Sequence, residues 1–200
     1  MWRLKRETLF LILIMLLAAV LRLSTLGHSA FRADTMDFFR YAKAGTDPIS
    51  IIKNQPWENQ IPLTEAYMLY FLKATKLPAN PWTVRLPIAL FGILAVYFVW
   101  KLASETFGKK TGLIAAFISA INPFAVSVSM EAYYYSGVIC FAAFFLWASI
   151  RVLLNYTSIG ISWKDWLLWL VAAVLMCSTH MTTWSIFGSV SFFIFIYFIF

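Results

Sequence analysis

Long apolar stretches separated by short polar segments dominate the pattern along the chain. An α-helix needs about 20 mostly apolar residues to cross the roughly 30 Å hydrocarbon core of a membrane. Several stretches come close to that length, and each is expected to form a membrane-spanning helix. The expected spans are residues 8–26, 85–102, 111–127, 137–154, 165–181 and 183–200. The pattern predicts an all-α fold, a polytopic transmembrane helical bundle.

Residues 27–82 form a long segment outside the predicted spans. Asp34 fits the N-cap of a short helix that ends near Ala44, because its carboxylate can accept the free N–H groups of a first turn. A second helix is expected over residues 62–75, where apolar residues recur at helical spacing. Its apolar face comprises Leu63, Tyr67, Phe71 and Ala74. Both helices are expected to be amphipathic and to lie along the membrane surface.

Asparagine, proline and arginine residues indicate where some of the expected helices begin, break or end. Asn80 can cap a helix that has Pro81 at its first position, and the second span, residues 85–102, follows. Pro123 follows Asn122 and interrupts the third span near its outer end, where water or neighbouring groups can satisfy the freed carbonyl. Arg22 lies near the outer end of the first span, and its guanidinium is expected to extend outward to water.

Basic residues indicate how the bundle is oriented. They precede the first span and occupy short connections on the same side: Arg3, Lys5, Arg6, Lys109, Lys110, Arg151 and Lys164. Because Lys and Arg favour cytoplasmic loops, the N-terminus is expected in the cytoplasm and residues 27–82 outside. The first apolar stretch exceeds the roughly 7–15 residues of a signal-peptide core, so it is expected to remain as a span.

Composition agrees with an integral membrane protein and excludes other classes. The chain is 62% hydrophobic and 12% charged, whereas a soluble domain is about 45–50% apolar and about 25% charged. Its net charge of +7 is spread over helix ends without a nucleic-acid motif, so membrane lipids and not nucleic acid are the expected partners. Cys140 and Cys177 lie in apolar stretches and predict neither a disulfide framework nor a metal site.

The most charge-dense segment near the apolar stretches is residues 31–42, which holds Asp34 and Asp37. A surface carboxylate can act as a general base toward an acceptor hydroxyl. Basic side chains nearby could hold a phosphate, arginine in bidentate fashion and lysine as a point charge. The candidates for phosphate binding are Arg32, Arg40, Lys43 and Arg85. The alternative is that the two aspartates only cap a helix.

Several stretches, read together, resemble one large family. They are Gln60-Ile61-Pro62-Leu63, Arg85-Leu86-Pro87-Ile88-Ala89-Leu90-Phe91-Gly92, Phe107-Gly108, Asn122-Pro123-Phe124, Ser129-Met130-Glu131-Ala132 with Tyr135, and Thr179-His180. In order and spacing they resemble the polyprenyl-phosphate-sugar glycosyltransferases of the GT-C superfamily, which include protein O-mannosyltransferases and aminoarabinose transferases. The resemblance extends over about residues 5–200. Such proteins are usually longer, and this chain ends inside an apolar stretch, so we expect it to be the N-terminal portion of a longer transmembrane module.

The resemblance implies a catalytic carboxylate in the first outer loop. Asp37 and Tyr41 match the family's Asp and Tyr, whereas Phe38 replaces a second acid, which leaves open whether Asp34 supplies it. Tyr133 stands where relatives have an arginine. By the same resemblance, Glu131, Tyr135 and His180 are substrate-site candidates, although His180 also fits a hydrogen-bonded polar anchor better than a metal ligand.

The resemblance implies an enzyme that moves a sugar from a polyprenyl-phosphate donor to a hydroxyl of a protein, lipid or glycan. Transfer would occur at the outer face with inversion, and a prokaryotic plasma membrane is the expected location. The sequence identifies no cofactor and leaves a divalent metal open. Two alternatives remain: a non-catalytic scaffold or subunit of this fold, and a transporter or channel subunit.

Overall fold

The computed structural model describes residues 6–24, 26–27, 33–54, 63–158 and 160–199. The side chains of residues 33–35, 37, 54, 63, 157 and 158 lie outside that description. The described residues form ten α-helices. This all-α architecture confirms the predicted fold class.

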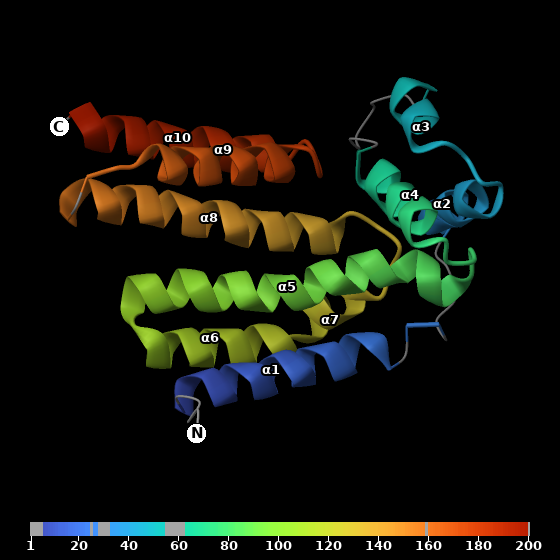
Figure 1. The fold of residues 1–200 in the computed structure, drawn as a ribbon, viewed down its shortest axis with the longest axis horizontal. Coiled ribbons are helices and arrows are strands. Elements are labelled where there is room, and N and C mark those ends of the chain that lie inside the picture. Colours follow the sequence, from blue (N-terminus) through green and yellow to red (C-terminus); the bar gives the residue numbers. More distant parts are fainter. Residues whose placement is uncertain (1–5, 25, 28–32, 55–62, 159, 200) are drawn as a thin grey trace.

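Long helices lie roughly parallel or antiparallel to one another and make a layered bundle (Figure 1). They are α1 (Arg6–Leu23), α5 (Pro81–Phe107), α6 (Lys109–Ile121), α8 (Tyr135–Ser158), α9 (Trp163–Cys177) and α10 (Thr183–Ile199). Three shorter helices cover one end of this bundle: α2 (Ala33–Lys43), α3 (Pro48–Asn54) and α4 (Leu63–Thr75). We call these three helices the capping layer and the end that they cover the capped end.

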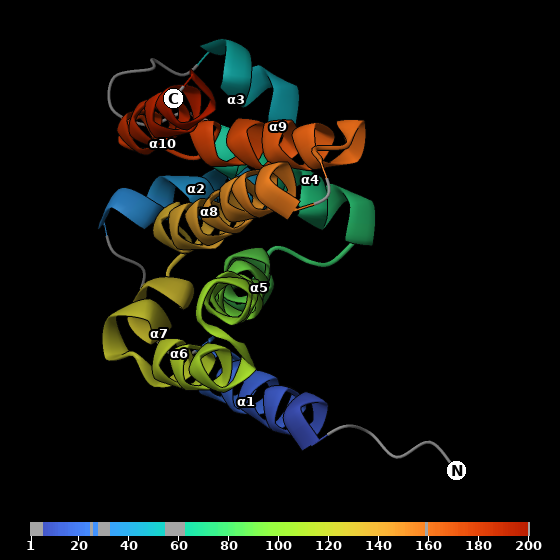
Figure 2. The ribbon, with the colours of Figure 1, turned by 90° about the vertical axis from the view of Figure 1, so that its left-hand side faces the viewer.

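The long helix α5 is the centre of the bundle, with α8 on one side and α6 and α1 on the other (Figure 2). Asn80 caps α5 as predicted, because its Oδ1 accepts the N–H groups of Trp82 and Thr83 at 3.0 Å each. Helix α5 ends at Phe107, and the next residue is Gly108, whose φ of 91° suits glycine. The chain then turns back directly into α6.

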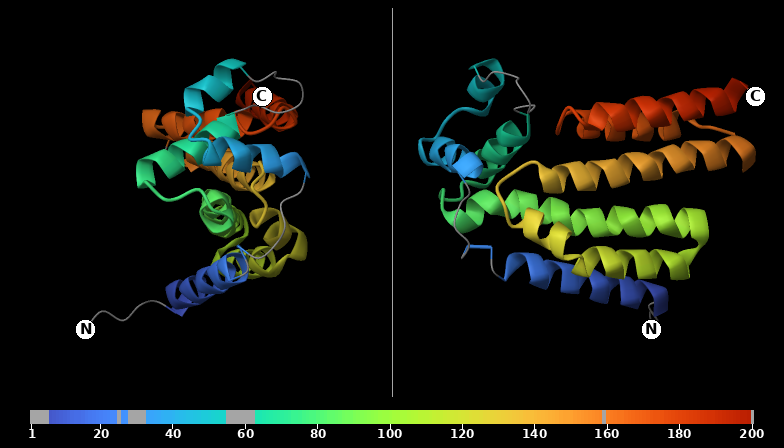
Figure 3. Two further views of the ribbon diagram at one scale, coloured as in Figure 1. Left: turned by 90° about the vertical axis from the view of Figure 1, so that its right-hand side faces the viewer. Right: turned by 180° about the vertical axis from the view of Figure 1, so that it is seen from behind.

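The third apolar stretch is broken at the predicted position. Helix α6 ends at Ile121, and α7 (Pro123–Ser129) continues at an angle of 58°. Pro123 has no N–H group for the helix, and the Asn122 side chain instead accepts the N–H of Ala125 at 3.0 Å. Figure 3 shows α7 leading from α6 toward the start of α8.

Arg22 corrects one prediction from the sequence. Its side chain is 1% exposed and does not extend to water. Nη1 donates hydrogen bonds to the carbonyl oxygens of Ala18 and Ala120, and Nη2 donates to that of Ser119. The two Nη atoms thus find acceptors at the end of α6, where Pro123 leaves carbonyls without their usual donors.

The capping layer also differs from the prediction in detail. Helix α2 begins at Ala33, so Asp34 belongs to its first turn and is not the N-cap residue. Helix α3 was not predicted; it follows Asp47, whose Oδ2 accepts the N–H of Ile49 at 3.2 Å. In α4 the buried apolar residues are Ala66, Met68, Leu69 and Leu72, which are not those predicted. Tyr67 and Phe71 of the predicted apolar face are half-buried and Ala74 is exposed.

Two helices, α5 and α8, are long and apolar enough to cross a membrane, and α6 with α7 makes a third if the bent pair is one span. Helix α10 is apolar but shorter. The chain is thus an all-α membrane protein. Its division into six spans and its orientation stay predictions.

Candidate functional site

One apolar cluster fastens the capping layer to the bundle. Its buried members are Phe38, Ala42, Ile51, Met68, Leu69, Leu72, Val84, Ile88 and Ala132. Phe38 and Ala42 stand one helical turn apart and form the buried face of α2. The cluster therefore holds α2 against the first turns of α5 and against the segment between α7 and α8, residues 130–134, which carries Ala132. We call this segment the connector.

The two aspartates proposed as catalytic lie on α2, which the cluster holds at the capped end. The side chains of Asp34 and Asp37 lie outside the described residues, as does the whole of Arg32. The backbone places Asp37 one helical turn before Tyr41, which is half-buried and packs against the cluster. Arg40 and Lys43 lie in the last turn of α2 and are exposed.

Arg85 lies in the second turn of α5 and is 2% exposed. Its Nη1 donates a 2.9 Å hydrogen bond to the carbonyl oxygen of Leu26, just after α1. Glu131, half-buried in the connector, lies within electrostatic reach of this guanidinium. Two charged candidates that are distant in sequence are thus brought to one place beneath α2.

Aromatic rings continue the site from Glu131 toward α10. Tyr133, Tyr134 and Tyr135 contact one another, with ring centroids 4.2 to 5.2 Å apart. Tyr134 also stacks on His180 with centroids 4.4 Å apart. Burial is the main cause that raises the pKa of Tyr134 above its ordinary value. Tyr135 is 38% exposed at the start of α8.

His180 has a defined hydrogen-bonding arrangement in the turn between α9 and α10. Its Nδ1 accepts the backbone N–H of Thr182 at 3.2 Å and lies 2.8 Å from the Thr182 hydroxyl oxygen. Burial lowers the pKa of the imidazole. The neutral ring with the proton on Nε2 is therefore favoured. This geometry agrees with the polar anchor expected from the sequence.

Helix α4 is tied to that same turn. The Thr64 hydroxyl donates to the carbonyl oxygen of Thr179 at 3.4 Å, and the hydroxyl oxygens of Tyr67 and Ser178 lie 3.2 Å apart. Between α4 and α5 lies a largely apolar groove of about 320 Å³. Its lining residues are Tyr67, Tyr70, Phe71, Ala74, Pro87, Leu90 and Phe91. An apolar chain could occupy this groove at the capped end.

The sequence analysis missed Glu65. It stands on the face of α4 that holds Met68, Leu69 and Leu72, and its Oε2 is buried without a hydrogen-bond partner. Burial is the main cause that raises the pKa of this carboxyl group. The sequence does contain a pattern that indicates this burial. The residues three, four and seven positions after Glu65 are apolar, so Glu65 shares a helix face with them.

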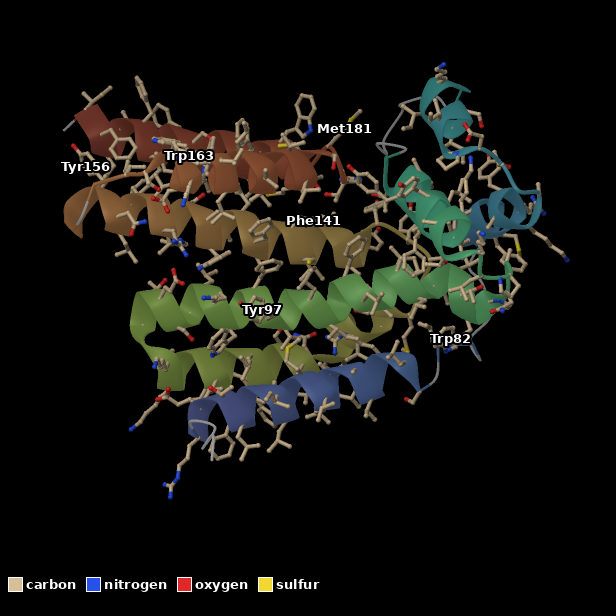
Figure 4. All side chains as sticks on the ribbon, viewed as in Figure 1. Trp82, Tyr97, Phe141, Tyr156, Trp163 and Met181 are labelled. Carbon is tan, nitrogen blue, oxygen red and sulfur yellow. The ribbon has the colours of Figure 1, made fainter. Side chains whose placement is uncertain are left out.

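The described residues contain no group of three or more His, Cys, Asp and Glu side chains that could hold a metal ion. Trp82 at the start of α5 and Met181 in the α9–α10 turn mark the capped end, whereas Tyr156 and Trp163 mark the opposite end (Figure 4). The candidate groups thus gather at one end of the bundle.

Comparisons with known proteins agree with the earlier resemblance. Two proteins of Bacillus subtilis (strain 168) are similar to this chain. "Putative mannosyltransferase YkcB" is 30% identical over 117 residues, which cover 58% of this chain and 15% of that protein. "Putative mannosyltransferase YycA" is 28% identical over 134 residues, which cover 62% of this chain and 19% of that protein. No solved structure matches the chain.

The family profile for dolichyl-phosphate-mannose-protein mannosyltransferases matches residues 62–200. The match begins just before α4 and includes α5, the Glu131 connector and the α9–α10 turn, whereas α1 and α2 precede it. The chain spans less than a fifth of the length of the two curated relatives. With its helical membrane fold and the order of its motifs, the chain belongs to the dolichyl-phosphate-mannose-protein mannosyltransferase family, within the GT-C superfamily.

Proposed function

We propose that this protein takes part in moving a sugar from a polyprenyl-phosphate donor to an acceptor hydroxyl at the capped end. The observation that carries the proposal is the apolar cluster joining α2, α5 and Ala132. That cluster brings the aspartate-bearing helix to the end of the bundle that also holds Arg85 and Glu131. Family membership supports a glycosyl transfer.

The groove between α4 and α5 is suited to the donor's prenyl tail. Its side chains are mostly apolar, and Pro87, Leu90 and Phe91 form its wall on α5. A lipid lying there would have its phosphate near the charged groups of the capped end. The family description names mannose, so polyprenyl-phosphate mannose is the first donor to test.

Asp37 is the proposed base, with Asp34 as the alternative. Asp34 lies in the first turn of α2, where the positive end of the helix dipole favours an ionised carboxylate, and Asp37 follows in the second turn, one helical turn before Tyr41. The acceptor oxygen would attack the anomeric carbon from the face opposite the phosphate, and its proton would pass to the carboxylate. The bond between the anomeric carbon and the phosphate oxygen would break, polyprenyl phosphate would leave, and the configuration would invert.

Basic side chains would stabilise the leaving phosphate. Arg40 and Lys43 are exposed on the last turn of α2 and can reach a ligand, and Arg32 is a further candidate. Arg85 is buried and held by Leu26, which suits a fixed positive charge that orients Glu131 or the phosphate. Tyr41, Tyr135 and His180 are the proposed contacts to sugar or acceptor.

The test is to compare Asp37→Asn and Asp34→Asn with the unaltered protein, scoring expression and sugar transfer separately. Losing a general base typically lowers the rate by about 10²–10⁴-fold. We expect that loss for Asp37→Asn with normal expression. Asp47→Asn is the matched control, because Asp47 is an exposed acid of the same layer paired with Lys73 at 3.2 Å.

If Asp34→Asn abolishes transfer while Asp37→Asn does not, the two roles are reversed. If both variants transfer sugar normally, α2 does not carry the base. If the unaltered protein leaves polyprenyl-phosphate mannose intact with protein, lipid and glycan acceptors, the proposed donor is wrong.

A further inference from the structure

We propose that the groove between α1 and α6 binds one anionic phospholipid from the leaflet at the end opposite the capping layer. This groove measures about 540 Å³ and is lined by apolar residues with one lysine among them. Its lining comes from Phe10, Leu13, Ile14 and Leu17 on α1 and from Lys110, Leu113, Ile114 and Phe117 on α6. An acyl chain would lie along the apolar residues, and the headgroup phosphate would contact Lys110.

The groove forms because α1 and α6 approach closely only along part of their length. Near the capped end, Ala18, Ala116 and Ala120 are fully buried in a shared cluster, and small side chains allow the helices to touch. Farther from the capped end the facing residues are larger, Phe10 and Leu13 on α1 and Leu113 and Ile114 on α6, and a groove remains between them. The alanine cluster therefore closes one end of the groove.

The open end of the groove carries positive charge. Glu7 on α1 pairs with Lys109 on α6, with Oε2 and Nζ 3.1 Å apart, which neutralises that lysine. Arg6 and Lys110 are exposed and form no ion pair within the part of the chain that the structure describes. Arg6 stands one helical turn before Phe10, on the same side of α1. Two exposed cations, Arg6 and Lys110, thus flank the place where an acyl chain would enter.

The length of the groove favours a lipid over a spanning helix as its occupant. From Phe10 to Leu17 the groove covers eight residues of α1, and the rise between these two residues is about 10 Å at 1.5 Å per residue. That is roughly a third of the 30 Å hydrocarbon core. A spanning partner helix needs an apolar track across the whole core, whereas one acyl chain of a single leaflet does not. The cations at the mouth match a phosphate headgroup.

Lipid retention tests the inference without any transfer assay. The protein would be placed in nanodiscs containing equal amounts of phosphatidylglycerol and phosphatidylcholine and then released for native mass spectrometry. We expect one phosphatidylglycerol to remain bound per chain. Lys110→Ala and Arg6→Ala should each lower its retention roughly fivefold, since a charge near the membrane surface contributes about that factor. Lys164→Ala is the control, an exposed lysine outside the groove, and should change nothing.

A second pair of variants tests the apolar part. Leu13→Trp fills the groove and should displace the lipid while the charges remain. Val20→Trp places the same ring on α1 outside the groove, at a residue that is 62% exposed, and should leave retention unchanged. Equal retention of both lipids, or equal effects of Lys164→Ala and Lys110→Ala, would overturn the inference. So would a change of oligomeric state on Leu13→Trp without loss of lipid, because the groove would then be a protein interface.

Discussion

Arg22 donates a hydrogen bond from Nη1 to the carbonyl oxygen of Ala120 at 2.9 Å, and so α1 completes the end of α6. Its Nη2 donates to the carbonyl oxygen of Ser119 at 3.3 Å. In an unbroken helix, Ser119 would receive the N–H of residue 123, but proline has none. One buried arginine therefore replaces donors that the Pro123 break removes, at a depth where an unsatisfied carbonyl is costly.

Replacing Arg22 should destabilise the bundle. In Arg22→Leu, each carbonyl left without a donor is expected to cost about 1–3 kcal/mol of unfolding free energy. Thermal unfolding in detergent measures the effect, with Arg6→Leu as the control because Arg6 is exposed on the same helix. Pro123→Ala restores an N–H for Ser119, so it should offset part of the loss in the double variant. Purely additive effects would contradict this account.

Gly92 should not tolerate a side chain. A Cβ there would lie 2.7 Å from Cβ of Ser129 and 3.0 Å from Nε of Arg22. Gly92→Ala is therefore expected to lower the melting temperature, because overpacking in a tight core costs about 1–3 kcal/mol. Gly188→Ala in α10 meets nothing within 4 Å and should be neutral or slightly stabilising, since alanine favours helix over glycine. Equal melting temperatures for the two variants would show that α1, α5 and α7 are packed less closely than described.

Glu65 should make stability depend on pH. Burial raises the pKa of its carboxyl group in the folded protein. Between the ordinary value of 4.5 and the raised value, the folded state binds more protons than the unfolded state, so stability falls as pH rises. Glu65→Gln should remove this slope and be at least as stable as the unaltered protein at pH 7. The measurement is unfolding in detergent at a series of pH values.

Asp47 should change the stability of the protein with pH in the direction opposite to Glu65. The hydrogen bond from Lys73 is the main cause that lowers the pKa of its carboxyl group. Its stabilising effect is therefore present above the ordinary pKa of 3.8 and is lost as pH falls through the lowered value. Asp47→Asn should leave the falling slope of Glu65 in place. A Glu65→Gln variant with an unchanged slope would mean that another group causes the pH dependence.

Local chemistry allowed the sequence to predict much of the fold. Asn80 and Pro81 start α5, and Pro123 breaks the third apolar stretch, because capping and the missing proline N–H act within one helical turn. The length of each apolar stretch likewise predicts a helix, and α5, α8 and α10 occupy three of those stretches. The motifs around Arg85, Glu131 and His180 also indicated the family before any geometry was known.

The tertiary structure alone decided which neighbours each side chain meets. The local sequence around Arg22 does not say whether its side chain extends to water or turns inward, and the broken end of α6 supplies the acceptors that favour the inward position. Glu65 looks like a surface acid until α4 is placed with that face inward. Phe38 is 3% exposed and anchors α2 in the apolar cluster. Burial is shared among distant segments, so no single stretch of sequence could specify these positions.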